Sequence, residues 1–262
     1  MTGKTFGLLG VLLSAVVAGS TLDARENDRA RSAFVERTAE VPILMYHRIR
    51  PLPPDGMVKW IMTFSVHPRA FEEQMRWLEQ HGYTAITLAE LSDYLRCGDA
   101  LPPKPVVITF DDGWHDQFQN AVPVLEHLDM RGEFFVCPKL VGTEGYMNWT
   151  EVRELADRGM GVEPHSLTHA RLTEMGPQAA WHEINDSRLL LEDEINRPTA
   201  CFAYPFGEST PELTKLVEDA GYVAAVGTDD GEIQRTSEIY ALRRIIVSYD
   251  TTIEQFAAKL GE

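Results

Sequence analysis

Two short motifs, far apart in the sequence, contain residues whose types and spacing could perform chemistry. TFDDG places two adjacent carboxylates, Asp111 and Asp112, at the end of an apolar run, and HSLTH carries two imidazoles, His165 and His169, four residues apart. One carboxylate and two histidines supply three N/O ligands, which suits a catalytic divalent metal that keeps an open coordination position. The second carboxylate would then be free to act as a general base on water. Together the motifs indicate metal-dependent hydrolysis.

Each motif also has a purely structural explanation. Two aspartates and a glycine before a helix would serve well as an N-cap. The spacing of the two histidines predicts that they lie on one side of a helical turn, where they could be hydrogen-bonded structural residues or part of an exposed turn. However, Asp111 and Asp112 directly follow an apolar, β-branched segment that is typical of a buried strand, so at least one carboxylate is poorly solvated and needs a partner. The presence of both motifs in one chain therefore favours metal binding.

The elements that must position these motifs alternate between two kinds. Strand-like segments are expected at residues 41–46, 83–86, 106–110, 133–136, 161–163, 200–204, 222–226 and 244–247. Helix-like segments are expected at residues 71–81, 88–95, 111–130, 149–158, 177–194, 211–220 and 253–260. The alternation predicts an α/β fold of mostly parallel strands, in a barrel or an open sheet. The number of strands favours a distorted (β/α) barrel of seven to eight strands in a single domain.

The residues that could perform chemistry fall at one end of these strands. In a parallel barrel the carboxyl ends of the strands form the face on which active sites assemble. Six residues of interest lie at or just past the carboxyl end of a predicted strand: His47, Asp111, Asp112, His165, Tyr204 and Phe206. We therefore expect these six residues to meet at one rim of the barrel.

Charge and the N-terminal segment limit the setting in which the protein works. A formal net charge of −16 argues against nucleic acid as a partner. Lys4 precedes an apolar stretch at 6–18, so residues 1–20 are predicted to be a signal peptide or an uncleaved N-terminal anchor, followed by a polar linker at 21–40 and the folded domain at 41–262. We expect export to the periplasm, cell envelope or exterior, with membrane contact only through an uncleaved N-terminus. The oligomeric state is left open.

The three cysteines do not form a recognisable framework. They are too few for a disulfide scaffold, and their spacing matches no zinc motif. Cys137 and Cys201 fall on or just after predicted core strands and are expected to be buried as small hydrophobic residues. Whether one disulfide forms among these two and Cys97 after export is left open.

The motifs resemble those of the polysaccharide deacetylases, carbohydrate esterase family four. TFDDG and HSLTH carry the resemblance, and it extends over the chain from Val41 onward, through VPILMYHRI, FAYPFG and LRRI. The last three segments are similar to the branch of poly-N-acetylglucosamine deacetylases, whose motifs are circularly permuted. The resemblance implies a metal-dependent hydrolase that removes N-acetyl groups from an N-acetylglucosamine-containing polysaccharide of the cell envelope or biofilm matrix. Alternatives are a deacetylase of peptidoglycan or another acetylated glycan, and a non-catalytic carbohydrate-binding relative.

The resemblance also implies a role for each motif residue. Asp112, His165 and His169 would bind the metal, with zinc the first choice and cobalt, nickel or iron as alternatives. Asp111 would be the general base. The C-terminal strand lacks the histidine that most family members use as general acid, and in the permuted branch His47 supplies it; the alternative is a structural histidine at a strand end.

Further residues are implied around this centre. The backbone N–H of Phe206 would donate to the oxyanion. Ala203 stands where the family often has the arginine that orients the base, and Arg244 is a candidate for that role. Three aromatic residues are candidates for contact with the sugar, with core packing as the alternative: Trp114, Trp149 and Tyr204.

Overall fold

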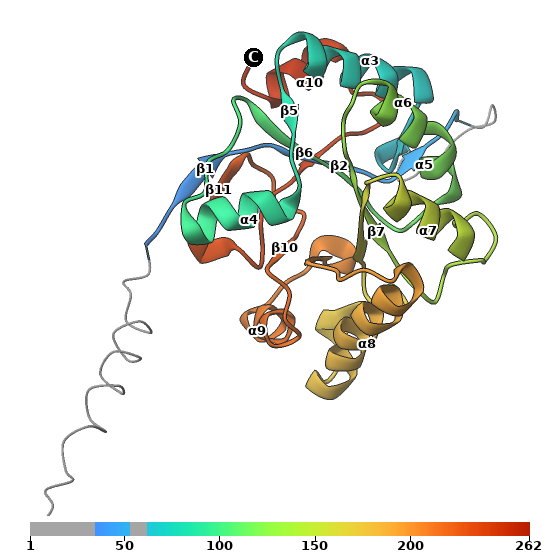
Figure 1. Ribbon diagram of the computed structural model, residues 1–262, viewed down its shortest axis with the longest axis vertical. Helices are drawn as coiled ribbons and strands as arrows, with labels where there is room; N and C mark the ends of the chain where they lie inside the picture. The colour runs from blue at the N-terminus through green and yellow to red at the C-terminus, as the bar shows by residue number, and fades with distance from the viewer. Residues whose placement is uncertain (1–34, 53–61) are drawn as a thin grey trace, which may run out of the picture. The chain divides into compact units, whose positions relative to one another are not determined.

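The structure, a computed structural model, describes residues 35–52 and 62–262 (Figure 1). The predicted signal peptide or anchor and most of the predicted linker lie outside the described residues. Within the described ranges, none of the helices has both the length and the apolar character needed to cross a bilayer.

The folded domain begins upstream of the predicted start at Val41. Thr38–Glu40 forms strand β1, which pairs antiparallel with β11 (Ile233–Arg235) and buries Ala39. The predicted linker therefore ends before Thr38. A three-residue strand with one buried side chain carries too little periodicity to be recognised in the sequence.

A parallel sheet forms the centre of the fold. Its hydrogen-bonded path runs β12 (Ile245–Ile246), β2 (Ile43–Tyr46), β6 (Pro105–Phe110), β7 (Glu133–Val136), β8 (Gly161–Pro164), and β5 (Thr84–Ala85) pairs with the start of β6. All these pairings are parallel. The strands are short and mostly buried, as expected for a parallel sheet covered on both faces.

Three further contacts continue the sheet into a ring. β9 (Cys201–Ala203) pairs in parallel with β10 (Ala224–Val226). The Glu163 carboxylate of β8 accepts hydrogen bonds from the N–H groups of Ala200 and Cys201 at 2.9 and 2.8 Å, and Val226 forms an isolated parallel bridge with Leu242, just before β12. The order β2–β6–β7–β8–β9–β10–β12 thus follows a distorted barrel, in which a side chain rather than backbone pairing joins β8 to β9.

Helices pack around this ring (Figure 1). They are α3 (Pro68–Gln80), α4 (Leu88–Cys97), α5 (His115–Asn120), α6 (Val122–His127), α7 (Trp149–Asp157), α8 (Pro177–Ile195), α9 (Pro211–Asp219) and α10 (Ile253–Lys259). Most lie within two residues of the predicted ranges, because capping residues such as Thr87 and Asn148 mark their starts. The stretch at 111–130 is instead divided into α5 and α6, since Pro123 lacks the N–H that an uninterrupted helix needs.

The remaining short elements connect these units. They are β3 (Arg48–Ile49), β4 (Ser65–Val66) and the 3₁₀ helices η1 (Leu172–Glu174), η2 (Pro205–Gly207) and η3 (Thr236–Glu238). β3 and β4 pair in parallel beside the end of β2. The three cysteines are free thiols, and Cys137 and Cys201 are buried as predicted.

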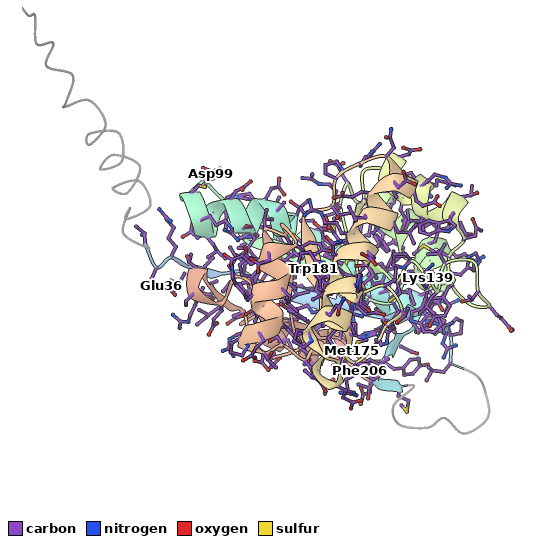
Figure 2. The ribbon with its side chains drawn as sticks, turned by 90° about the horizontal axis from the view of Figure 1, so that it is seen from below. Glu36, Asp99, Lys139, Met175, Trp181 and Phe206 are labelled. Atoms are coloured by element: carbon purple, nitrogen blue, oxygen red, sulfur yellow. The ribbon has the colours of Figure 1, made fainter. Side chains whose placement is uncertain are left out.

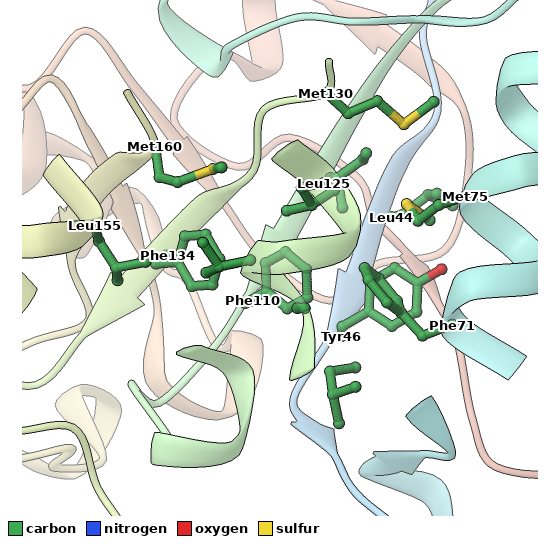
Figure 3. Close-up of a cluster of buried hydrophobic side chains, with 14 of the residues drawn as sticks. Leu44, Tyr46, Phe71, Met75, Phe110, Leu125, Met130, Phe134, Leu155 and Met160 are labelled. Carbon is green, nitrogen blue, oxygen red and sulfur yellow. The ribbon is translucent and has the colours of Figure 1, made fainter. Parts of the chain in front are cut away.

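The core has an outer and an inner part, and a third cluster lies where α8 and α9 pack on β9 and β10. Figure 3 shows the outer part, where Tyr46, Phe71, Phe110 and Phe134 pack between the sheet and the helices. The rings of Phe110 and Phe134 stack with centroids 4.5 Å apart. The inner part is a separate cluster in which Ile43, Val107 and Phe135, on the opposite face of β2, β6 and β7, pack with buried residues of β9, β10 and α4. The inner cluster fills the ring and leaves its carboxyl end free for polar residues.

Candidate metal-binding and catalytic site

Because side chains alternate between the two faces of a strand, the predicted site residues point to the inside of the ring. Successive side chains of a strand point to opposite faces. In β6, Phe110 belongs to the outer core cluster and Val107 to the inner one, so Asp111 continues the inner row. In β2, Ile43 belongs to the inner cluster, and His47 continues its row. The structure brings both residues to one cavity of about 590 Å³ at the carboxyl end of the strands.

Asp112, His165 and His169 form a cluster with metal-ligand geometry. One ligand atom from each lies within 4.8 Å of the others. Asp112 Oδ1 is 3.5 Å from His165 Nε2 and 3.2 Å from His169 Nε2. His165 Nδ1 lies 2.8 Å from the carbonyl oxygen of Ala203, so a proton on Nδ1 leaves the Nε2 lone pair facing Asp112. These donors fit a divalent cation such as zinc.

The HSLTH segment adopts a tight loop and not the predicted helical turn. Ser166 and His169 have φ values of 57° and 63°, which fold the backbone so that the two imidazoles approach. Ser166 Oγ accepts a hydrogen bond from the N–H of His169 at 3.0 Å. Glu183 of α8 accepts from both the N–H and the hydroxyl of Thr168, at 2.9 and 2.7 Å. A distant helix therefore fixes the loop that holds the two histidines.

Asp111 is held by a buried guanidinium. Arg244 Nη1 and Nη2 donate to the two carboxylate oxygens at 2.7 Å each, and Arg244 Nε donates to the carbonyl of Gly227. Burial alone would raise the pKa of Asp111, but the charge and hydrogen bonds of Arg244, with the nearby His165 and His47, hold it below its ordinary value. Asp111 is therefore an ionised carboxylate with a fixed orientation.

His47 lies beside Asp111. Its Nε2 is 3.9 Å from Asp111 Oδ2. Burial lowers the pKa of His47, and the negative charges of Asp111 and Asp112 offset this only in part. Gln117 of α5 donates to the backbone carbonyls of both His47 and Asp111, at 2.7 and 2.5 Å, and so ties the ends of β2 and β6 together.

Phe206 occupies a strained position on the same cavity. Its φ of 61° lies in the left-handed region, which non-glycine residues rarely adopt. The next residue, Gly207, must be a glycine because a Cβ there would lie 2.0 Å from Thr228 Oγ1. Close packing against Thr228 therefore fixes the course of the backbone around the Phe206 N–H.

The three aromatic candidates lie in different surroundings. Trp114 lines the cavity, and its indole N–H donates to Asp112 Oδ2 at 2.8 Å. Tyr204 also borders the cavity, but its ring packs in a core cluster and its hydroxyl donates to the Tyr240 carbonyl. Trp149 is not among the residues that line the cavity and packs against the outer core at the start of α7.

Several cavity residues are not among the predicted site residues, although Met45 and Arg48 lie within the VPILMYHRI segment. They are Met45, Arg48, Arg50, Phe64, Ser65, Thr228 and Ile246. Arg48, Arg50, Phe64 and Ser65 lie in or beside β3 and β4, which are two residues long each and show no periodic pattern. Only their parallel pairing beside β2 places them at the cavity.

Comparison with known proteins identifies the family. YxkH of Bacillus subtilis (strain 168), named as a polysaccharide deacetylase, is 32% identical over 234 residues, which is 89% of this chain and 81% of that protein. The family description "Polysaccharide deacetylase" matches residues 98–225. The chain belongs to the polysaccharide deacetylases. The poly-beta-1,6-N-acetyl-D-glucosamine N-deacetylase of Staphylococcus aureus (strain MW2) is 24% identical over 275 residues, covering 95% of this chain and 94% of that enzyme.

Solved structures agree with this polysaccharide deacetylase fold. The Streptococcus pyogenes deacetylase PplD, in complex with acetate, aligns with a TM-score of 0.77 and 25% identity over 84% of this chain and 97% of its own. IcaB from Ammonifex degensii aligns with a TM-score of 0.72 and 25% identity over 85% and 97%. The likeness covers about 85% of this deacetylase chain.

Proposed function

We propose that this polysaccharide deacetylase removes N-acetyl groups from an N-acetylglucosamine-containing polysaccharide of the cell envelope or biofilm matrix. The observation that carries the proposal is the ionised, Arg244-bound Asp111 beside the Asp112–His165–His169 cluster in one cavity. The name of the S. aureus relative supports the substrate class, since that enzyme is a poly-beta-1,6-N-acetyl-D-glucosamine N-deacetylase. Such a substrate agrees with export of the chain.

Asp112, His165 and His169 would hold the divalent metal. One carboxylate and two neutral imidazoles form a common three-residue set in catalytic zinc sites, and cobalt, nickel and iron are alternatives. When bound, such a metal polarises the acetyl carbonyl and makes water more acidic. Burial would raise the pKa of Asp112, yet its contacts with His165 and His169 hold that pKa well below the usual range, so the ligand carboxylate is charged.

Asp111 would act as the base. Each of its oxygens accepts one hydrogen bond from Arg244, which leaves further lone pairs to accept the proton of the attacking water. The bidentate contact prevents rotation of the carboxylate. Because the site is buried and the geometry is already set, little reorganisation is needed during attack on the acetyl carbonyl.

His47 would protonate the departing amine. An amine is a poor leaving group unless it gains a proton as the C–N bond breaks. His47 Nε2 lies 3.9 Å from Asp111 Oδ2, which is longer than a direct hydrogen bond, so the proton taken from water would reach the imidazole through one bridging water. The Phe206 N–H would donate to the carbonyl oxygen as negative charge develops there. The products are acetate and a free amino sugar.

Acetate release tests the proposal. Purified protein supplied with zinc, cobalt or nickel is mixed with poly-N-acetylglucosamine, chitin oligomers, peptidoglycan and acetylxylan in parallel. We expect release from the N-acetylglucosamine polymers and a near-complete loss in Asp111→Asn. Faster acetate release from peptidoglycan or acetylxylan would mean that the proposed substrate class is wrong. No acetate release with any metal would favour a carbohydrate-binding protein without catalysis.

A further inference from the structure

One face of the short strands β3 and β4 is polar and lines the catalytic cavity. The two strands pair in parallel, with Arg48 opposite Ser65, and the N–H of Arg50 continues the pairing by donating to the carbonyl of Val66 at 2.9 Å. Side chains alternate along a strand, so Arg48, Arg50 and Ser65 share one face. The opposite face carries Ile49 and Val66, which are buried in the outer core. The three polar residues all line the cavity.

Two of these three side chains have hydrogen-bonding groups without partners. Arg48 is already paired, since its Nε donates to Asp116 at 2.5 Å and its guanidinium carbon lies 4.1 Å from the centre of the Trp114 ring. Within residues 35–52 and 62–262, Arg50 has no carboxylate partner, and its Nε is buried without a hydrogen bond. The Oγ of Ser65, a residue that is 1% exposed, is also buried without a partner. Buried polar groups left unpaired cost free energy, so the pair marks a place where a ligand can bind.

The charge of Arg50 is not compensated by its neighbours. Burial and the adjacent Arg48 charge lower the pKa of Arg50, and Asp116 opposes this only in part. A guanidinium nevertheless stays protonated in proteins. Two carboxylates line the cavity, Asp111 and Asp112, and both are held by the partners described above. Arg50 is therefore an uncompensated cation in a protein whose formal net charge is −16.

An anionic group of small size has the chemistry that this face lacks. A carboxylate or phosphate oxygen accepts hydrogen bonds from both a guanidinium and a hydroxyl, and it also balances the charge of Arg50, which a neutral hydroxyl cannot do. The negative charge of the whole protein disfavours a polyanion, because charges are screened only beyond about 10 Å. The ligand is therefore one isolated anionic group. Figure 2 shows Phe206, which lines the same cavity, near the periphery of the molecule, so a group carried on a polymer can reach the cavity from solvent.

We propose that Arg50 and Ser65 bind a single anionic group, a carboxylate or a phosphate, that the glycan carries close to the sugar that is deacetylated. This inference rests on the proposed function, because it takes Asp111 and the metal-ligand cluster as the reaction centre. The site recognises a charged substituent and not a sugar ring. A glycan that carries such a group should therefore be a better substrate than its neutral counterpart.

Two N-acetylglucosamine pentamers that differ only in charge give the first test. One carries a carboxymethyl group at O6 of its sugars, about one per molecule, and the other carries the isosteric, neutral carbamoylmethyl group. We expect kcat/KM for acetate release to be about three- to tenfold higher for the charged pentamer, and this ratio should fall toward one between about 0.1 and about 1 M salt. In Arg50→Gln the ratio should be about one, and Arg50→Lys should restore part of it. Arg235→Gln removes an exposed arginine of β11 outside the cavity and should keep the wild-type ratio.

Binding measured without hydrolysis gives the second test. Asp111→Asn protein is titrated with both pentamers in a calorimeter, and we expect tighter binding of the charged one by a similar factor, reduced when Ser65→Ala is added. Equal values for the two pentamers, or a preference that survives Arg50→Gln, would overturn the proposal. Arg50-dependent binding of inorganic phosphate without a preference between the pentamers would assign the site to a free anion and would overturn it too. Tighter binding of the charged pentamer without acetate release from either one would refute the proposed function alone, since the anion site would still be present.

Discussion

Two pairs of carboxylates, all buried except the partly exposed Asp112, lie in the same ring of strands and differ in charge. Asp111 and Asp112 follow β6 at the cavity, and the pKa of each lies below its ordinary value even though burial acts in the opposite direction. Glu133 and Glu163 lie on β7 and β8, and burial raises the pKa of Glu133 to about 7 and that of Glu163 well above its usual range. Burial alone therefore does not decide the charge of a carboxylate in this protein.

The partners of each pair explain the difference. The aspartates contact the Arg244 guanidinium and two imidazoles, whereas the glutamates accept hydrogen bonds mainly from backbone N–H groups. Glu163 joins β8 to β9, and Glu133 accepts from the N–H of Leu88 at the start of α4. Gly161 makes room for this pair, since a Cβ there would lie 2.1 Å from Glu133 Oε2. The ionised aspartates are suited to catalysis and metal binding, whereas the glutamates hold neighbouring strands and helices together.

The largest loss of activity is expected when Asp111, the proposed base of the charged pair, is replaced. Asp111→Asn keeps the shape but cannot accept a proton, so acetate release should fall about 10³-fold or more. Because Asp111 is not assigned as a ligand, bound zinc measured by mass spectrometry of metals should stay near one equivalent. Asp112→Asn should instead lose the metal. Similar metal loss in both variants would contradict the division of roles between the two aspartates.

Replacement of Arg244, whose guanidinium contacts Asp111, should give Asp111 a raised pKa like those of Glu133 and Glu163. In Arg244→Met, burial is no longer opposed by a guanidinium, so the pKa of Asp111 should rise and the acid limb of kcat/KM should move to higher pH. We expect about 10²-fold lower activity at neutral pH and about 3 kcal/mol lower stability in urea. Arg243→Met is the matched control, since Arg243 pairs with Glu238 outside the cavity. An unchanged pH profile in Arg244→Met would argue against this origin of the Asp111 charge.

The glutamate pair should make stability depend on pH. The folded-state pKa of Glu133 is about 7 against an ordinary 4.5, so the folded state binds more protons and the free energy of unfolding should fall as pH rises between these values. Glu133→Gln cannot ionise and should reduce that fall by about 2 kcal/mol. Urea unfolding of both proteins at pH 5 and pH 8 measures this change in the free energy of unfolding. Exposed Glu154→Gln is the control, and an equal pH dependence in Glu133→Gln and wild type would refute the assignment.

The smallest effect concerns the orientation of a ligand carboxylate. Trp114→Phe keeps an aromatic ring against Arg48 and Tyr146 but removes the N–H that donates to Asp112. Hydrogen bonds to metal ligands commonly change affinity by 10- to 100-fold, and we expect about tenfold weaker zinc binding in competition with a chelator. Trp149→Phe, away from the cavity, should bind zinc like wild type. Wild-type affinity in Trp114→Phe would mean that its hydrogen bond is not needed.

Much of this arrangement could be predicted from the sequence because it follows from local patterns. The apolar run before Asp111 predicted β6, and the alternation of strands and helices predicted that His47, Asp111 and His165 meet at the carboxyl ends. Two of the predicted helices begin at capping boxes, at Thr87 and Asn148, each formed by residues three positions apart. These features depend on residues that are close together in the chain.

The parts that could not be predicted depend on contacts between distant segments. The i,i+4 spacing of His165 and His169 suggested a helical turn, but Glu183, fourteen residues beyond His169, holds the segment in a loop. Phe64 reaches the cavity through a two-residue strand without a pattern. Trp149 had sugar contact and core packing as open alternatives, and it packs against the core at the first turn of α7, because the sequence around a single tryptophan does not distinguish a core position from an exposed one.

Reconstitution of metal-stripped protein shows whether deacetylation depends on a metal held by Asp112, His165 and His169. Protein freed of metal with a chelator is titrated with zinc while acetate release from an N-acetylglucosamine pentamer is measured. We predict no release without metal and a rise that levels off at one equivalent, since Asp112, His165 and His169 form a single ligand cluster. Full release by the stripped protein, or the same zinc-dependent rise in His165→Ala, would contradict the account.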